Sequence, residues 1–409
     1  MIVNIRKDGD QYMAYFIEMR RLIGVNQMGA DIINWYFNLG IDKDQISHRI
    51  VKSYCIPPEN AVCDVTEFLK SINLELQPSR FNDTDQADVH LPIGIELEIT
   101  SACNLRCIHC LQSNYSALYI DLNKAYSIID TIASAGVFEI SIIGGEPFKH
   151  PSIFELLKHA NDSGLAVGLT TNGTLIKKRQ IHGMAKMKNL SVAVSVDGIG
   201  EDHDHTRGNG VFIKIDRTIR RMLDSGIEVE AMFTVTSYNI DRYKPVLEYC
   251  NELGITCNFN LFKPFKIGHV ALVPNPQQFF ELILTLFELR SQNKSQIGLS
   301  NSALVGHLLG LPPKNECRAG QAGLVIDVHG HMLTCPSLLY CGYYKESDFP
   351  LFDENFIETW RTHPLFTGFK RNGLRGCQAR SYIFSQNVSG GDPYDLTSFI
   401  NFLEKRKRF

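Results

Sequence analysis

The residues best suited to chemistry are three cysteines in one short loop, Cys103, Cys107 and Cys110, spaced C-x3-C-x2-C. Three thiolates this close in sequence can bind three corners of a cubane iron–sulfur cluster, which leaves the fourth iron without a protein ligand. An iron with an open position can bind and reduce an outside molecule, which a four-cysteine electron carrier cannot do. Two alternatives stay open on spacing alone: three structural cysteines, or a zinc site that lacks one ligand.

Predicted strands and helices alternate from Leu91 onward and decide the fold class. An apolar-alternating run at Ile93–Ile99 predicts a strand that ends directly before the cysteine loop. Further strands are expected at Glu139–Ile143, Ala166–Thr171, Ser191–Val196, Glu228–Thr236 and Thr256–Phe262. The helices expected between them lie at Asn123–Ala135, Pro151–Ser163, Lys177–Ala185, Phe212–Ser225 and Asp241–Leu253. This alternation requires a parallel sheet with helices outside it, hence an α/β fold, either a partial barrel or an open doubly wound sheet.

Unusual residues stand at the ends of these strands, where ligands bind in parallel α/β sheets. The second strand is followed by Gly144-Gly145-Glu146-Pro147. Two glycines let the backbone approach a ligand closely, and the Glu146 carboxylate can accept hydrogen bonds from an ammonium group. The third strand ends in Thr171-Asn172 and the fourth in Ser195-Val196-Asp197, and each of these alone is also typical of an ordinary polar turn.

Cysteine spacing and strand-end residues together resemble the radical S-adenosylmethionine (SAM) superfamily. The resemblance implies a partial (β/α)6 TIM-type barrel, a 4Fe–4S cluster on the three cysteines and SAM at its free iron. The residues that it implies around SAM are Gly144, Gly145, Glu146, Pro147, Thr171, Asn172, Ser195, Asp197 and Arg207. Glu146 would meet the SAM amino group, Ser195 the ribose or carboxylate, and Asp197 would shape its own loop. Arg207, in a His-Asp-x-x-Arg-Gly turn at His203–Gly208, either binds a carboxylate or pins the loop.

Residues 1–80 have the pattern of a separate unit. Tyr12–Val25 alternates like a short hairpin, and amphipathic helices follow at Asn26–Phe37, at Lys43–Tyr54 and from Pro57 onward. A hairpin followed by three helices predicts a winged-helix-like domain; the alternative is an N-terminal cap on the larger domain. A polar linker is expected at Pro78–Gln86.

This first unit resembles the peptide-recognition element in maturases of ribosomally made peptides, of which the peptide chaperone of pyrroloquinoline quinone biosynthesis is the type example. The matching features are the hairpin, the Asn-x-x-Gly-Ala opening at Asn26–Ala30 and the helix segment Asp64–Leu69. The resemblance implies that a leader peptide adds a strand to the sheet edge and lies along the third helix.

Four more cysteines, Cys317, Cys335, Cys341 and Cys377, occur in the C-terminal part of the chain. A predicted hairpin that turns at Gly330 and reaches Cys335 resembles the Gly-x4-Cys hairpin of the auxiliary-cluster domains called SPASM, or Twitch in the shorter form. Four cysteines can ligate one auxiliary 4Fe–4S cluster, whereas a complete SPASM region carries at least seven. The alternative is a set of scattered buried cysteines. The expected domains are therefore 1–80, the radical SAM core at 91–300 and the auxiliary region at 301–409.

The amino-acid composition indicates the number of domains, the kinds of partner and the compartment. The 409 residues are 44% hydrophobic with a net charge of -3, which suits a chain of two or three domains and gives no sign of a nucleic-acid partner. No apolar run approaches the length of a membrane span, and the N-terminus lacks a secretory apolar segment. Eleven cysteines in such a chain favour the reducing cytoplasm and metal ligation over disulfides.

The implied function is that of an enzyme in which an electron from the reduced cluster cleaves SAM to methionine and a 5′-deoxyadenosyl radical. With the N-terminal unit, the resemblance implies modification of a ribosomally synthesised precursor peptide, by a thioether or carbon–carbon crosslink. The expected partners are that peptide with its leader and an external electron donor such as flavodoxin or ferredoxin. Two alternatives remain: an oxidase or decarboxylase of a small molecule such as a haem precursor, and a non-catalytic iron–sulfur sensor that binds peptides.

Overall fold

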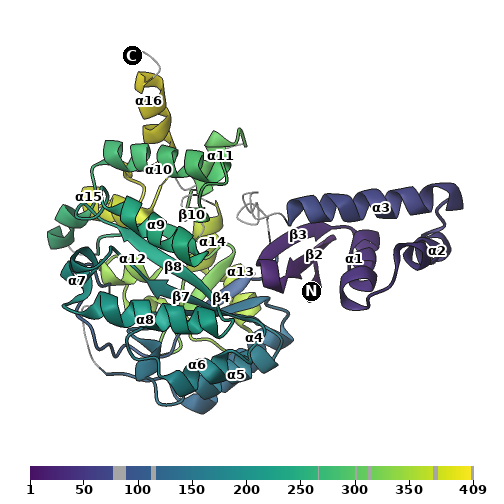
Figure 1. Ribbon diagram of the computed structural model, residues 1–409, viewed down its shortest axis with the longest axis horizontal. Coiled ribbons are helices and arrows are strands. Elements are labelled where there is room, and N and C mark those ends of the chain that lie inside the picture. The colour runs from purple at the N-terminus through teal and green to yellow at the C-terminus, as the bar shows by residue number, and fades with distance from the viewer. Residues whose placement is uncertain are drawn as a thin grey trace. The chain divides into compact units, whose positions relative to one another are not determined.

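Two units make up the chain, Met1–Ile93 and Gly94–Phe409, and each is described by itself (Figure 1). The computed structural model describes residues 1–76, 89–111, 117–265, 267–299, 302–311, 316–317, 319–371 and 376–406. The polar linker expected at Pro78–Gln86 lies outside the described residues.

The first unit contains an antiparallel sheet in the order β1-β2-β3. Its strands are β1 (Val3–Asp8), β2 (Gln11–Phe16) and β3 (Arg21–Val25). The hairpin expected at Tyr12–Val25 is formed by β2 and β3, with Tyr12 opposite Val25. Strand β1 was not expected, because its charged residues obscure a short alternation of apolar residues. The signal for it is the two-residue turn between Asp8 and Gln11, where Gly9 has a φ of +65° that favours glycine.

Three helices complete the first unit: α1 (Gln27–Ile33), α2 (Lys43–Tyr54) and α3 (Pro58–Glu75). The side chains of Asn26 and Asp42 cap the first two, since each accepts a hydrogen bond from a backbone N–H of the first turn. Apolar residues of α3 at helical spacing, among them Val65, Leu69 and Ile72, are buried in the two hydrophobic clusters of this unit. The unit thus has a core of its own.

The second unit is built on a nine-stranded sheet in the order β10-β9-β8-β7-β6-β5-β4-β11-β12. The six central strands are parallel: β4 (Gly94–Glu98), β5 (Glu139–Ile143), β6 (Ala166–Thr171), β7 (Leu190–Ser195), β8 (Glu228–Val235) and β9 (Thr256–Leu261). The helices between them are α4 (Leu122–Ser134), α5 (Ile153–Asp162), α6 (Lys178–Met184), α7 (Glu201–Arg207), α8 (Val211–Asp224) and α9 (Tyr243–Leu253). The expected α/β fold with a parallel sheet is confirmed, and the bounds of the expected strands and helices differ from expectation by at most two residues.

Short strands extend both edges of the six-stranded sheet. Strand β10 (Ile297–Leu299) pairs in parallel with β9, and β11 (Gly323–Ile326) pairs in parallel with β4. Strand β12 (Met332–Leu333) is the antiparallel partner of β11, which forms the hairpin expected near Gly330. The remaining helices are α10 (Pro276–Ser291), α11 (Ser302–Leu308), α12 (Pro336–Tyr340), α13 (Phe356–Thr362), α14 (Pro364–Arg371), α15 (Gln378–Ser385) and α16 (Leu396–Arg406). The C-terminal region therefore contributes strands to the same sheet as the barrel.

The two faces of the parallel sheet differ in polarity. Residues such as Ile140 and Ile142 of β5 are fully buried, whereas their neighbours in sequence are partly exposed. The same alternation in β8 and β9 exposes Thr234, Asn258 and Asn260 in part. One face thus holds the apolar core, and the other presents polar groups accessible to water. No helix of the described residues is long and apolar enough to cross a membrane.

Candidate active site

The cysteine loop begins where β4 ends and is fixed by backbone hydrogen bonds on both sides. Ile99 N donates to Ile143 O at 3.0 Å, and Ser101 N donates to Leu118 O at 3.1 Å. The Thr100 hydroxyl accepts a hydrogen bond from Ala102 N at 3.0 Å. These hydrogen bonds fix the backbone of the segment that leads into Cys103, Cys107 and Cys110.

Two glycines at the end of β5 lie directly against this segment. Gly145 N donates to Thr100 O at 2.7 Å, and Glu146 N donates to Ala102 O at 2.8 Å. A Cβ atom at Gly144 would meet Thr100 O at 2.4 Å, and one at Gly145 would meet Ala102 O at 2.6 Å. Both distances are too short for any larger residue. The two glycines therefore let the backbone after β5 bind the backbone that leads into the cysteine loop.

The Glu146 carboxylate is fully buried and accepts three hydrogen bonds from the protein. Its Oε1 accepts from Thr171 Oγ1 at 2.7 Å and from Phe148 N at 3.1 Å, and its Oε2 accepts from Asn172 N at 2.7 Å. Burial raises the pKa of Glu146, while these donors act in the opposite direction. The carboxylate joins the end of β5 to the end of β6. The resemblance also implies that Glu146 accepts a hydrogen bond from the ammonium group of SAM, and this role stays a prediction.

We expect Glu146→Ala to lower the free energy of unfolding by about 2–4 kcal/mol, because it leaves buried donors at Thr171 and Asn172 unpaired. Glu146→Gln should cost less, since an amide oxygen still accepts from one strand end. Chemical denaturation of both variants measures the difference. SAM titration of the same proteins tests the ligand role, and an unchanged affinity in Glu146→Ala would limit Glu146 to holding the loop.

The segment after β6 reaches the cysteine loop from the other side. Asn172 Nδ2 donates to Asn104 Oδ1 at 3.0 Å and to Cys103 Sγ at 3.9 Å. The Asn172 Oδ1 atom accepts from Thr174 Oγ1 at 2.6 Å, which fixes the orientation of the amide. Glu146 thus binds both Thr171 and Asn172, which were expected beside the cofactor, and Asn172 contacts Cys103.

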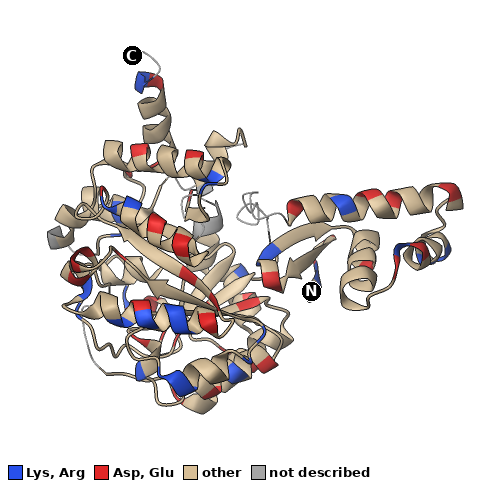
Figure 2. Ribbon diagram, viewed as in Figure 1, with Lys and Arg blue, Asp and Glu red and all other residues tan. Residues whose placement is uncertain are grey.

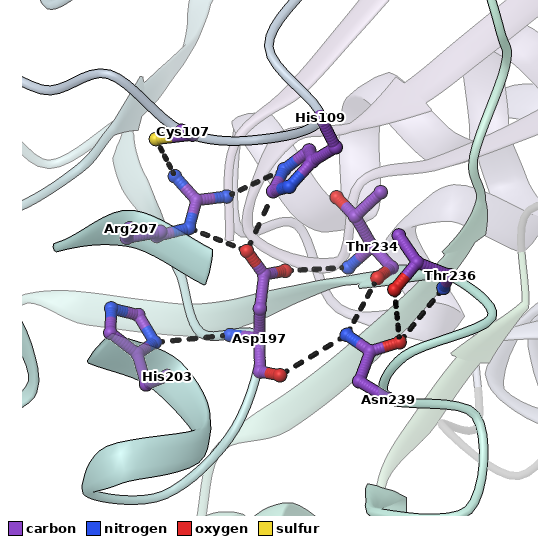
Figure 3. A network of polar contacts seen from close by, with 8 residues as sticks. All are labelled: Cys107, His109, Asp197, His203, Arg207, Thr234, Thr236 and Asn239. Atoms are coloured by element: carbon purple, nitrogen blue, oxygen red, sulfur yellow. Dashed lines mark hydrogen bonds and ion pairs between the residues drawn. The ribbon is translucent and has the colours of Figure 1, made fainter. Parts of the chain in front are cut away.

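Asp197 lies at the centre of a polar network formed by the ends of β7 and β8 (Figure 3). Its Oδ2 accepts from Arg207 Nε at 2.5 Å, and its Oδ1 accepts from Thr234 N at 2.9 Å. Its backbone oxygen accepts from Asn239 Nδ2 at 3.1 Å, and its N donates to His203 Nδ1 at 3.2 Å. Burial alone would raise the pKa of Asp197, but the Arg207 charge holds it below its usual value. The two side chains form a buried ion pair.

The segment expected as a turn at His203–Gly208 is mostly helix, since α7 spans Glu201–Arg207. Gly200 and Gly208, with φ of +57° and +116°, flank this helix. The Asp204 carboxylate accepts from the N–H groups of Gly210 and Phe212 at 2.6 and 2.8 Å, which ties α7 to the start of α8. The helix ends at Arg207 and directs that side chain to Asp197.

His109, between Cys107 and Cys110, is enclosed by the same network. Its Nε2 lies 3.4 Å from Arg207 Nη2 and 3.6 Å from Asp197 Oδ2, and its ring meets Phe262 edge-on at 6.2 Å between centroids. Burial, aided by the Arg207 charge, lowers the pKa of His109 to about 4. The imidazole is therefore neutral near pH 7, and its contact with Asp197 is not an ion pair.

The groups around the three cysteines suit thiolates bound to iron. Leu105 N donates to Cys103 Sγ at 3.4 Å, and Arg207 Nη1 donates to Cys107 Sγ at 3.8 Å. Hydrogen bonds to ligating sulfurs are among the means by which proteins tune iron–sulfur clusters. Among the described residues, no three ligating side chains converge on a single metal ion. A cubane has no such requirement, because each thiolate binds a different iron. The residues present fit the cluster.

The four C-terminal cysteines lie together. Cys317, Cys335, Cys341 and Cys377 all pack against one small cluster formed by Leu338 and Ala379. Burial, then the neighbouring cysteines, raise the pKa of Cys317 to about 12. Arg380 forms a buried ion pair with Asp392 at 2.7 Å, and Asp392 also accepts from Cys377 N at 2.6 Å. These four thiols fit a single auxiliary cluster.

Several residues that the sequence did not single out belong to these sites. Thr234, near the end of β8, and Asn239, in the segment after β8, hold Asp197 in place, and their polarity at this position is the only signal for them. Lys263, which follows β9, interacts electrostatically with Cys377, Cys335 and Cys317. Tyr340, at the end of α12, interacts with both Glu98 and Cys110. Ser195 ends β7 opposite Met232 and is partly exposed, as a ligand-binding residue must be.

Comparisons with known proteins test the expected fold and superfamily independently of the structure. The chain is 26% identical over 326 residues to mycofactocin maturase MftC of Mycobacterium ulcerans, covering 74% of this chain and 87% of that protein. It is 24% identical over 345 residues to the AdoMet-dependent heme synthase of Methanosarcina barkeri, covering 75% and 97%. Its fold is similar to that of Streptococcus suis SuiB bound to the precursor peptide SuiA, with a TM-score of 0.67, 15% identity and coverage of 90% and 89%.

The family model of the radical SAM superfamily matches residues 97–250. This stretch begins in β4, contains the cysteine loop, and continues through the ends of β5, β6 and β7 to α9. It therefore includes every strand-end residue described above around the three cysteines. The chain therefore contains a radical SAM domain at residues 97–250, and the maturase and the synthase that align with about three-quarters of it are both enzymes.

Proposed function

We propose that this enzyme modifies a ribosomally synthesised precursor peptide, forming a thioether or carbon–carbon crosslink. Cys103, Cys107 and Cys110 would hold a 4Fe–4S cluster, and Gly144–Pro147 would lie beside the bound SAM. Thr171, Asn172, Ser195, Asp197 and Arg207 are the further residues proposed for this site. When reduced, the cluster with SAM supplies a radical that can abstract hydrogen from an unactivated carbon.

The residues of the chain serve this chemistry by position. The Gly144–Gly145 backbone and the Glu146 carboxylate lock three strand ends around the cysteine loop, so little rearrangement is needed when ligands bind. The polar, partly exposed face of β8 and β9, with Thr234, Asn258 and Asn260, offers donors and acceptors to the backbone of a peptide.

The first unit is the observation that carries the proposal for a peptide substrate. The larger unit, Gly94–Phe409, makes up about three-quarters of the chain, and the MftC and heme synthase alignments cover a similar share. The SuiB likeness covers 90% of the chain, so it extends into Met1–Ile93. A separate sheet-and-helix unit of this kind suits a protein that holds part of its substrate away from the chemistry.

The surface of the first unit suggests how a leader peptide binds. Strand β3 is an edge of its sheet, so its outer backbone groups can pair with an added strand. Helix α3 exposes four acidic residues and one lysine (Figure 2). The acidic residues are Glu59, Asp64, Glu67 and Glu75. A leader that carries basic residues would match this charge.

The region at 301–409 is proposed as an auxiliary-cluster domain next to the radical SAM core at 91–300. Replacing Cys335 and Cys341 together by Ala should lower the iron content from about eight to about four per chain, since one 4Fe–4S cluster would remain. SAM cleavage in the absence of a peptide should persist, because the first three cysteines are unchanged. Iron content unchanged by the substitution would contradict an auxiliary cluster at these residues.

A second candidate function is supported by the heme synthase relative, which the chain matches over 97% of that protein's length. Such an enzyme would oxidise or decarboxylate a haem precursor and would not need the first unit. The test is direct: the reduced enzyme is incubated with SAM and each short peptide encoded beside its gene, and in parallel with haem precursors. A peptide that loses two hydrogen atoms by mass spectrometry supports the maturase. Turnover of a haem precursor alone would overturn it.

The proposal also includes a compartment and an electron donor. We place the enzyme in the cytoplasm, where a low-potential donor such as flavodoxin or ferredoxin can supply electrons. Eleven cysteines, all free among those that the structure describes, accord with a reducing compartment.

A further inference from the structure

Arg207 is a buried cation that lies between an acid and a proposed cluster ligand. Its side chain is 10% exposed, and each of its three nitrogens has a contact (Figure 3). Nε donates to Asp197 Oδ2 at 2.5 Å, Nη1 donates to Cys107 Sγ at 3.8 Å, and Nη2 lies 3.4 Å from His109 Nε2. The guanidinium is thus directed at the cysteine loop by a helix, α7, from another part of the chain.

Neither role expected for Arg207 from the sequence accounts for these contacts. A residue that only pins its loop would need Asp197 but not the sulfur. A residue that binds a carboxylate of a ligand would keep its paired nitrogens for that carboxylate, as guanidinium forks usually do. Here the two outer nitrogens face Cys107 and His109 instead.

The neighbours of Arg207 make its charge effective at the sulfur. His109 Nε2 lies beside Arg207 Nη2, so Nη1 is the nitrogen that faces Cys107. Asp197 is kept ionised and fixed by Thr234 N and Asn239, so it orients the guanidinium without moving toward the cysteine. Cys107 therefore receives a cationic N–H donor in a site with little solvent.

We propose that Arg207 is a positioning residue for Cys107, and that its hydrogen bond to this sulfur raises the reduction potential of the cluster bound there. The reduced cluster carries one more negative charge than the oxidised cluster, so a cation at a ligating sulfur stabilises the reduced form more. The inference rests on the proposed cluster at Cys103, Cys107 and Cys110, and it concerns tuning of that site, not the substrate.

The test measures a potential, which a merely structural residue would not move. Arg207→Gln alone would leave Asp197 buried without a partner, so the main variant is Arg207→Gln with Asp197→Asn, which removes both charges. Arg207→Lys keeps the charge but loses the fork. The matched control is Arg220→Gln, which breaks a half-exposed pair with Asp216. The full-length proteins are reconstituted with iron and sulfide, and a redox titration measures the midpoint potential of the cluster. EPR spectroscopy follows the cluster signal that SAM alters.

We expect the midpoint potential of the double variant to shift to more negative values. The potential of Arg207→Lys should lie between that of the double variant and wild type, and Arg220→Gln should match wild type. An unchanged potential in the double variant, or a double variant that is folded by circular dichroism but holds no cluster, would overturn the inference. Failure of the proposed function has a different signature: the wild-type protein itself would hold no cluster that responds to SAM.

Discussion

Simultaneous replacement of Cys103, Cys107 and Cys110 by Ala is expected to remove about four iron atoms per chain and to abolish SAM cleavage. The reason is that these thiols are the only cysteines in the loop that Gly145, Glu146 and Asn172 hold in place. The four C-terminal cysteines gather around Leu338 and Ala379 and should keep their own cluster. Iron analysis and the yield of 5′-deoxyadenosine under dithionite are the two measurements.

A matched control separates this effect from a general loss of thiols. Cys55 and Cys63 are exposed and belong to the first unit, so their replacement by Ala should change neither iron content nor SAM cleavage. A triple variant of the loop that still produced 5′-deoxyadenosine would contradict the assignment of the radical-generating site to these cysteines.

The parts of the fold that follow from local pattern were predictable from the sequence. Strands such as β5 and β6 are short apolar runs between polar loops, and their bounds could be read directly. The order of six βα units then required a parallel sheet, and that requirement brought Gly144, Asn172 and Asp197 to one edge. The positions of site residues along the chain were therefore available before the structure.

The partners of those residues were not predictable, because most of them lie on a different element of the fold. The sequence presented Glu146 as a free acceptor and Arg207 as a cation of uncertain use. The structure shows the first bonded to Thr171 and Asn172, and the second to Asp197. Nothing in a single sequence encodes which donor will fill a buried acceptor, since that depends on how strands align in three dimensions.

The sheet edges were predicted only in part. The hairpin of β11 and β12 was expected, but strand β10 was not, because three residues are too few for an alternation to be recognised. The pairing of β11 with β4 links segments more than two hundred residues apart. The pairing of the C-terminal cysteine region with the edge of the barrel is thus a tertiary contact that no local sequence pattern predicts.

The last prediction concerns the first unit. Its end is tied back to its own sheet: His90 N donates to the Asp8 carboxylate at 2.9 Å, and Arg6 donates to the backbone oxygens of Leu91 and Pro92, each at 2.8 Å. A clean truncation therefore removes residues 1–93 and begins at β4, whose neighbours on both sides belong to the larger unit. We expect this truncated enzyme to cleave SAM at close to the wild-type rate when no peptide is present.

The same truncation should abolish turnover of a precursor peptide that bears its leader, since the edge of β3 and the acidic face of α3 are gone. Residues 1–93 made alone have their own buried core and should bind the leader, with affinity that falls as salt rises because the proposed match is between opposite charges. Circular dichroism and iron content of the truncated enzyme establish that the barrel is intact. Unimpaired peptide turnover by an intact truncated enzyme would show that recognition lies in the barrel and not in the first unit. Separate leader binding would make recognition and chemistry independent, so one barrel could modify any core sequence that its leader delivers.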